Sequence, residues 1–183
     1  MTSARLRSRS VLPFLSLAAR LWSFGCGYTT RPGLPSHFKT VYVKPFANKV
    51  DITQVGLNTE RFPIYRHRME VDLTNALLER LQFTGILRPA PADRADTRLE
   101  GELIGFSRDA LRYDQSSQVE EWRLNLSVHL RFFDQTAGTM LWEEERLVGD
   151  TTYLVASESE SAALARAITD LARRIVERLV ENW

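Results

Sequence analysis

The chain has 183 residues, which is most simply one domain with short appendages. With 44% hydrophobic and 26% charged residues, its composition excludes a disordered chain and a protein made of many membrane spans. The formal net charge is +1, but residues 1–25 carry four arginines and no acid. The rest of the chain has 20 basic and 23 acidic residues, a balance of −3 that argues against a general nucleic-acid binder.

A basic and then apolar start predicts a secretory signal over residues 1–25. The apolar run VLPFLSLAA at 11–19 follows the basic MTSARLRSRS and is shorter than the roughly 20 residues that span a bilayer. The chain's only cysteine, Cys26, comes directly after the small residue Gly25. In bacterial lipoproteins the residue after the cleavage site is a cysteine that becomes lipidated. We therefore expect a lipid anchor on Cys26, although Ser23 stands where the lipobox usually has leucine.

Two other interpretations of Cys26 stay open, namely an ordinary cleaved signal and a buried thiol. A single cysteine excludes an internal disulfide and a cysteine-based zinc cluster.

Because prolines and glycines punctuate GYTTRPGLPS, we expect residues 26–37 to be a tether and 38–183 to be a single α/β domain. No apolar run after Cys26 approaches about 18 residues, so we expect no second membrane segment.

Hydrophobic periodicity predicts a strand and a helix in the first half of the domain. The segment FKTVYVKPF at 38–46 is rich in β-branched and aromatic residues, which favours a strand. An irregular loop over 47–65 separates it from a predicted helix at 66–83, where apolar residues recur at helical spacing. We expect this helix to stop at Gly85 and to be followed by a proline-containing connection over 87–96.

Three strands are predicted next, over 97–108, 119–133 and 139–149, with a hairpin turn at 134–138. The middle strand alternates most clearly, which predicts one buried face and one polar face. The apolar positions are Trp122, Leu124, Leu126, Val128, Leu130 and Phe132, and the polar positions are Arg123, Asn125, Ser127, His129 and Arg131. The polar face is expected to meet water or a partner.

An apolar stripe at helical spacing predicts a last helix over 158–179, capped by Ser157 or Ser159. The first strand, the first helix and the second strand favour a right-handed parallel crossover, and the last three strands favour an antiparallel meander. The predicted fold class is therefore α/β: a two-layer sandwich in which two helices pack on a four-stranded mixed sheet, in the order βαβββα.

Catalytic motifs are absent from the sequence. It contains no G-x-S-x-G, no P-loop and no H-E-x-x-H, and its three histidines lie far apart, so we expect no catalytic residue, no metal site and no cofactor. One catalytic alternative stays open. A hydrolase would need two carboxylates within about 5–10 Å across a cleft, and the candidates are Glu100, Glu102, Glu143 and Glu145.

Arginines offer a binding interpretation. Arg108 and Arg112 are predicted to flank the loop between the second and third strands. Guanidinium groups at such a place suit phosphates or carboxylates, which they bind with paired hydrogen bonds. The structural alternative is that both arginines pair with Asp109 and Asp114 nearby.

Six segments, taken in sequence order, form a recognisable series. They are GCGY, FKTVYVKPFANK, VDLTNALLERL, LEGELIGFSRDALRYDQ, VEEWRLNLSVHLRFFDQTAGTMLWEEE and IVERLVENW. By their order and spacing they resemble the LPS-assembly lipoprotein family (LptE-like), and the resemblance runs from about Cys26 to Trp183.

The resemblance implies a non-catalytic outer-membrane lipoprotein, lipid-anchored on the periplasmic face. Such proteins plug and help assemble the LptD β-barrel, bind lipopolysaccharide and assist its transport to the cell surface. By charge and position alone, the candidate lipopolysaccharide-contacting residues are Arg108, Arg112, Arg123 and Arg131. No nucleic acid is expected among the partners. The alternative is another envelope lipoprotein that activates a peptidoglycan synthase.

Overall fold

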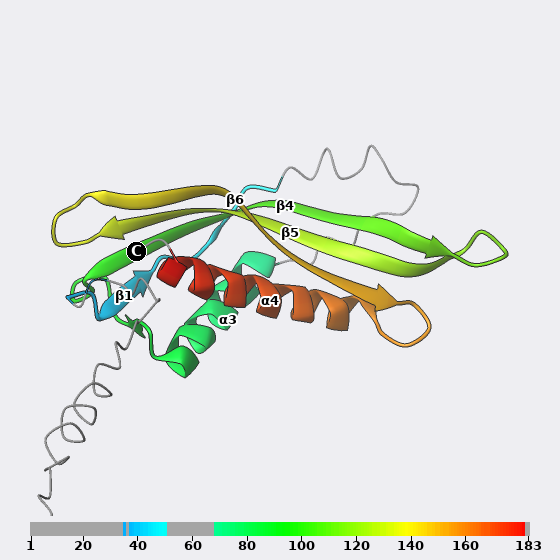
Figure 1. Cartoon of the computed structure of the whole chain (residues 1–183), viewed down its shortest axis with the longest axis horizontal. Coiled ribbons are helices and arrows are strands. Elements are labelled where there is room, and N and C mark those ends of the chain that lie inside the picture. Colours follow the sequence, from blue (N-terminus) through cyan, green and yellow to red (C-terminus); the bar gives the residue numbers. More distant parts are fainter. Residues whose placement is uncertain (1–34, 36, 51–67, 182–183) are drawn as a thin grey trace, which may run out of the picture. The chain divides into compact units, whose positions relative to one another are not determined.

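A computed structural model describes Pro35, residues 37–50 and residues 68–181. The predicted signal, Cys26, most of the predicted tether, residues 51–65 of the expected loop and Trp183 lie outside the described residues. The elements are β1 (Thr40–Val43), β2 (Ala47–Asn48), α3 (Met69–Thr84), β3 (Arg88–Pro89), β4 (Thr97–Tyr113), β5 (Val119–Asp134), β6 (Met140–Leu154) and α4 (Glu160–Glu181). Figure 1 shows them along the chain.

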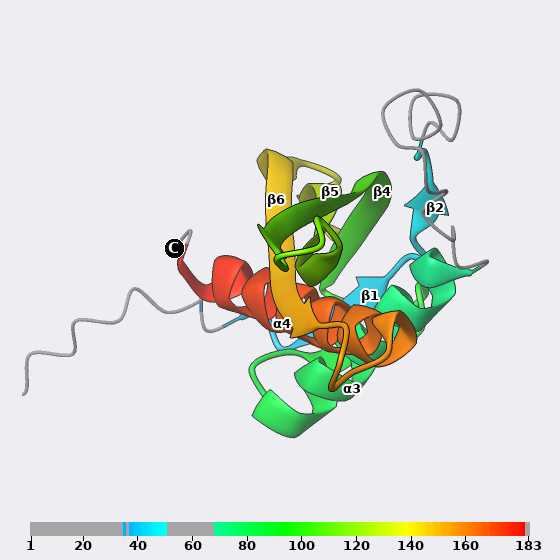
Figure 2. The ribbon, with the colours of Figure 1, turned by 90° about the vertical axis from the view of Figure 1, so that its right-hand side faces the viewer.

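The strands form one mixed sheet in the order β3–β1–β4–β5–β6, with β2 also paired to β4. β1 and β4 pair in parallel and are connected through α3, whereas β4, β5 and β6 form an antiparallel meander. The parallel pairing of the crossover and the meander are therefore confirmed. Both helices lie on the same face of the sheet (Figure 2). The predicted two-layer α/β sandwich is confirmed, but the sheet has six strands and not four.

The two additional strands, β2 and β3, are each only two residues long. β2 lies in the segment predicted as a loop, and β3 lies in the predicted connection. Each pairs in parallel with a longer neighbour, β2 with β4 and β3 with β1. Two residues carry no measurable alternation of apolar and polar positions, so periodicity could not reveal these strands.

The core lies between the sheet and the helices, and the predicted apolar face of β5 forms its centre. Leu124, Leu126, Val128, Leu130 and Phe132 are completely buried. α4 adds a buried stripe of nine residues from Ala163 to Leu179, as its periodicity predicted. Among the described residues, neither helix has the length and apolar character needed to cross a bilayer.

The sequence predicted a capping residue for the end of the first helix and for the start of the last helix, and both predictions are confirmed. α3 ends at Gly85, which adopts a left-handed conformation with φ of 65° and donates its N–H to the carbonyl of Leu81 at 3.0 Å. α4 begins after Ser159, whose Oγ accepts a hydrogen bond from the N–H of Ala162 at 3.3 Å. These caps satisfy backbone groups that the helices themselves leave unpaired.

Arginines of α4 tie the helix to the edge strand β6. Arg166 donates to the carbonyl of Thr152 at 2.8 Å, and farther along the helix Arg178 donates to Glu144 at 2.8 Å. As the helix numbering rises the strand numbering falls, so α4 runs antiparallel to β6 and fastens it at both ends. These contacts also occupy polar groups on a strand that has no neighbour on its outer side in the described sheet.

Asp96 fastens β1 to the start of β4. Its Oδ2 accepts hydrogen bonds from the backbone N–H groups of Lys39 and Thr40, both at 2.9 Å, and from Thr40 Oγ1 at 2.8 Å. The hydrogen bond from Lys39 and then those from Thr40 hold the pKa of Asp96 below its usual value. The ionised carboxylate therefore stabilises the junction between the two strands.

Replacing Asp96 with Asn is expected to lower the free energy of unfolding by about 1 kcal/mol at neutral pH, because charged hydrogen bonds become neutral ones. Since folding lowers the pKa of Asp96, its stabilisation is complete well above about pH 4 and is lost as the pH falls below that value. Urea denaturation at several pH values checks this. The difference between wild type and Asp96→Asn should shrink in acid; a constant difference would contradict the account.

Candidate functional site

The sheet face opposite the helices carries a ladder of paired acidic and basic side chains. Arg131 on β5 lies 3.3 Å from Glu100 and 3.7 Å from Glu102, both on β4. His129, also on β5, lies between Glu102 at 4.0 Å and Glu143 of β6 at 2.7 Å. We call these five residues the polar face. It confirms the predicted alternation of β5 except at Ser127, which is buried, and it brings together acids and bases from three strands.

The polar face lends no support to the hydrolase interpretation. Glu100 and Glu102 stand two residues apart on one strand and share Arg131 as a partner. Glu143 lies beside His129 on the same open face. A glycosidase pair would face each other across a bound substrate, whereas these carboxylates lie side by side and contact cations.

Arg108 occupies a different environment from the predicted loop. β4 continues to Tyr113, so Arg108 lies within the strand, and its side chain is only 13% exposed. It forms an ion pair with Glu160 at the start of α4, and its guanidinium stacks over Trp122 at 4.2 Å from the ring centroid. Tyr153 donates to the same carboxylate at 3.3 Å. Arg108 therefore joins the sheet to α4, and the prediction that it flanks a loop is wrong.

Burial sets the chemistry of the cluster around Arg108. Burial, and then the charge of Glu160, raise the pKa of Tyr153 above its usual value. The phenol is therefore protonated at neutral pH and can donate its hydrogen to Glu160. A ligand could reach Arg108 only by displacing Glu160, which makes this arginine a structural residue in the described fold.

Arg112 lies near the end of β4 and is largely exposed. Its guanidinium lies 3.3 Å from Glu120 and 3.2 Å from Glu121, both on β5. It therefore pairs across the hairpin, and not with Asp109 or Asp114. Its neighbours in the chain, Leu111 and Tyr113, are exposed large hydrophobic residues. This end of the sheet combines charge with apolar surface.

Arg123 and Arg131 both lie on β5 but far apart along it. Arg123 is exposed and stands opposite Asp109 of β4, whereas Arg131 stands opposite Glu100. At about 3.3 Å per residue, eight residues separate them by about 26 Å. The four predicted arginines therefore do not form one site, because Arg108 packs on the helix side and Arg131 belongs to the distant polar face.

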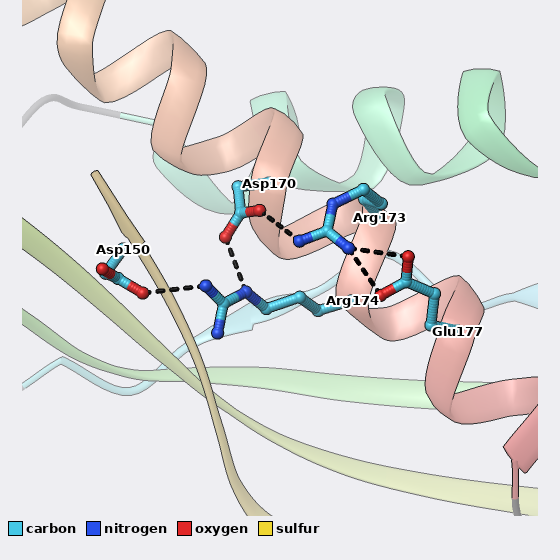
Figure 3. Close-up of polar contacts among 5 residues, drawn as sticks. All are labelled: Asp150, Asp170, Arg173, Arg174 and Glu177. Atoms are coloured by element: carbon cyan, nitrogen blue, oxygen red, sulfur yellow. Dashed lines mark hydrogen bonds and ion pairs between the residues drawn. The ribbon is translucent and has the colours of Figure 1, made fainter.

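A cluster that sequence reasoning missed runs along α4 (Figure 3). Asp170 accepts hydrogen bonds from Arg173 and Arg174, both at 2.6 Å. Arg173 also binds Glu177 at 2.6 Å, and Arg174 reaches Asp150 of β6 at 2.8 Å. Burial alone would raise the pKa of Asp170, but the two arginines outweigh it and hold that pKa below its usual value. Sequence analysis could have predicted this cluster from the spacing of three and four residues between Asp170 and the two arginines, which places them on one side of a helix.

The family becomes clear once this fold and its surfaces are compared with known proteins. Residues 38–179 match the family described as LptE, lipopolysaccharide-assembly. The chain belongs to the LptE family. This confirms the resemblance expected from the sequence. No curated protein matches the chain in sequence.

Solved structures share the fold of this LptE-family chain at low sequence identity. A hypothetical protein from Chlamydia trachomatis is 14% identical, with a TM-score of 0.55 over 78% of this chain and 95% of that one. A protein from Xanthomonas campestris is 10% identical, with a TM-score of 0.56 over 84% and 93% of the two chains. At such identities these likenesses establish the architecture alone.

Proposed function

We propose that this LptE-family chain is a non-catalytic lipoprotein of the outer membrane, anchored through Cys26 on the periplasmic face. In this proposal it plugs and helps assemble an LptD-type β-barrel and assists lipopolysaccharide transport to the cell surface. The family match over residues 38–179 is the observation that carries the proposal. The match covers nearly the whole described domain, including α3, every strand and all but the last two residues of α4.

The polar face suits a plug inside a barrel. The interior of an outer-membrane barrel is polar and its outer band is apolar, so a plug needs polar surface toward the wall. Arg131 and His129 on this chain alternate with Glu100, Glu102 and Glu143, and each of these groups already has a polar side-chain partner on the same face. Such a surface can exchange its contacts with a polar wall and leaves no charge buried alone.

Lipopolysaccharide contact fits the exposed end of the sheet better than the remaining predicted positions. Arg112 and Arg123 are exposed there, and guanidinium groups bind phosphates with short, charge-assisted hydrogen bonds. Leu111 and Tyr113 add apolar surface beside Arg112, which suits an amphiphilic molecule. Arg112 also has acidic partners, but its side chain is 54% exposed. The side chains of Arg108 and Arg131 are only 13% and 37% exposed and pair with acids of the fold, so we assign them the weaker contribution.

We expect an LptD-type barrel to co-purify with the tagged protein from detergent-solubilised outer membranes. Mass spectrometry of the same sample should show a lipid-modified cysteine, Cys26, as its first residue. Recovery of a peptidoglycan synthase in place of a barrel would favour the alternative envelope function. An N-terminus that retains residues before Cys26 would contradict the anchor.

The matched control is Cys26→Ala, which removes the thiol and leaves residues 38–183 untouched. This variant should no longer sediment with outer membranes, because two or three acyl chains are what holds a soluble domain stably at a bilayer. Its thermal unfolding midpoint should equal that of the wild-type domain. A variant that still sediments with membranes would show that another part of the chain binds them.

A further inference from the structure

The start of β1 and the end of α3 lie at one end of the domain, on the left of Figure 1. β3 follows α3 directly and pairs in parallel with β1, with Arg88 opposite Thr40. The hairpin between β5 and β6 lies at the same end, because Asp134 at the end of β5 stands opposite Thr97 at the start of β4. The expected tether over 26–37 leads into β1 here. We call this end of the domain the tether end.

Exposed apolar side chains lie at the tether end. Phe83, in the last turn of α3, is 81% exposed, and Ile86 just beyond the helix is also exposed. Successive helix residues are about 100° apart, so Phe83 lies about 200° around α3 from the buried Leu81, on the side away from the core. Met140, at the start of β6, is another exposed apolar residue here. Side chains of this size gain free energy wherever an apolar environment covers them.

Two exposed cations also lie at the tether end. Lys39 and Arg88 are neighbours, because the N–H of Arg88 donates to the carbonyl of Lys39 at 2.9 Å. The acids beside them already have partners. Asp93 lies 3.7 Å from Arg94, and Asp96 accepts the backbone hydrogen bonds that fasten β1. The charge left at this end is therefore positive, which suits a surface of anionic lipid headgroups.

The length of the tether indicates which partner this end meets. Even a fully extended chain over the twelve residues 26–37 spans no more than about 40 Å. β4 alone has 17 residues, which at about 3.3 Å per residue is about 55 Å. A lipid anchor on Cys26 therefore holds the tether end close to the bilayer, whereas the opposite end of the sheet lies a whole strand length farther along the domain.

We propose that the tether end docks on the surface of the bilayer that carries the anchor. Phe83 and Ile86 enter the headgroup region, and Lys39 and Arg88 meet anionic headgroups. The proposal rests on the lipid anchor of the proposed function. Because two side chains cover little area, this contact orients the anchored domain and does not hold it at the membrane once the anchor is lost. The hairpin between β4 and β5 consequently points away from the bilayer.

Fluorescence quenching of the lipid-modified protein in vesicles tests the contact. Bimane is attached at Gln82→Cys, beside Phe83, or at Ser116→Cys, in the hairpin between β4 and β5; both positions are exposed. The lipid on Cys26 occupies its thiol, so the introduced cysteine alone reacts. The vesicles contain phosphatidylcholine, phosphatidylglycerol and a lipid with a nitroxide quencher near its headgroup. We expect severalfold stronger quenching at residue 82 than at residue 116, because only the first label lies at the docked end.

Replacing the apolar residues measures their part in the docking. Phe83→Ser combined with Ile86→Ser should remove most of the quenching at residue 82, because the apolar contact with lipid is lost. The matched control is Leu154→Ser combined with Val155→Ser, which removes two exposed apolar side chains from the opposite end and should leave that quenching unchanged. Thermal melting checks that both variants are folded. Equal losses in the two variants would overturn the proposal.

The lipid composition tests the cations. Vesicles without phosphatidylglycerol, or with it at high salt, should quench the label at residue 82 less, because the attraction of Lys39 and Arg88 to anionic headgroups is removed or screened. Equal quenching in all these conditions would overturn the part assigned to the two cations. Equal quenching at residues 82 and 116 would overturn the docking as a whole.

Two results separate this inference from the proposed function. A lipid-modified protein that co-purifies with a barrel, but is quenched equally at residues 82 and 116, refutes the docking alone. If the purified protein carries no lipid on Cys26, the labels are placed on a Cys26→Ala chain held to nickel-chelating vesicles by an N-terminal histidine tag. Stronger quenching at residue 82 there upholds the docking although the native anchor is refuted, and equal quenching refutes both.

Discussion

Leu126→Ala is expected to lower the free energy of unfolding by about 2–5 kcal/mol. Leu126 is completely buried in the middle of β5, opposite Phe106 of β4 and Gly149 of β6. Removing its side chain loses the free energy gained when apolar groups are transferred from water to the core, and it leaves a cavity beneath α4. The neighbouring strands are held by backbone pairing on both sides, so the site cannot easily collapse to fill that cavity. Denaturation in urea, monitored by far-ultraviolet circular dichroism, measures the loss.

Arg123→Ala is the matched control for the opposite face of the same strand. Arg123 is exposed, and removing an exposed side chain usually changes stability by no more than about 0.5 kcal/mol. The contrast between two positions three residues apart on β5 tests the assignment of faces directly. A loss below about 0.5 kcal/mol for Leu126→Ala would mean that the faces are inverted.

The longest elements were predictable because each repeats one pattern many times. β5 alternates six apolar positions between 122 and 132, and only Trp122 at its end is not fully buried. α4 repeats its apolar stripe from Ala163 to Leu179, over more than four turns, and α3, β5 and β6 all pack against this helix. Over such lengths the pattern outweighs local irregularities, so fold class and connectivity followed from the sequence.

An irregularity in β4 explains the error over Arg108. The register with β5 shifts between Leu103 and Gly105. Before the shift odd-numbered residues such as Leu99 and Leu103 face the core, and after it Phe106 and Arg108 do. A bulge of this kind exchanges the two faces of a strand, so the alternation read from sequence is lost there. Two further register shifts, between Ala110 and Arg112 and between Arg112 and Tyr113, disturb the alternation beyond residue 108, where the predicted strand ended.

The ion-pair partners of the predicted arginines could not be identified from one sequence, because they depend on how the strands and helices pack. Arg131 meets Glu100 because β4 and β5 pair in one particular register, and Arg108 meets Glu160 across 52 residues of chain. Charge alone marked these arginines as candidates, but their partners decide whether they are available to a ligand.

Gly149→Ala is expected to destabilise the fold by about 1–3 kcal/mol, because it forces β6 away from α4. A Cβ at Gly149 would lie 2.6 Å from Cβ, 2.9 Å from Cα and 3.0 Å from N of Leu171. Two of those atoms belong to the helix backbone, so no side-chain rotation relieves the contact. α4 must move as a body, which also stretches the contacts of Arg174 with Asp150 and of Arg178 with Glu144.

Gly105→Ala separates this steric effect from the general consequence of replacing a strand glycine. A Cβ at Gly105 would meet Ser127 Cβ at 3.4 Å, an ordinary contact. Alanine there should be neutral or stabilising by about 0.5–1 kcal/mol, since glycine loses more conformational freedom on folding. Thermal unfolding of both variants provides the comparison. Similar midpoints for Gly149→Ala and Gly105→Ala would show that α4 does not rest on β6 at Leu171, because only that close approach distinguishes the two positions.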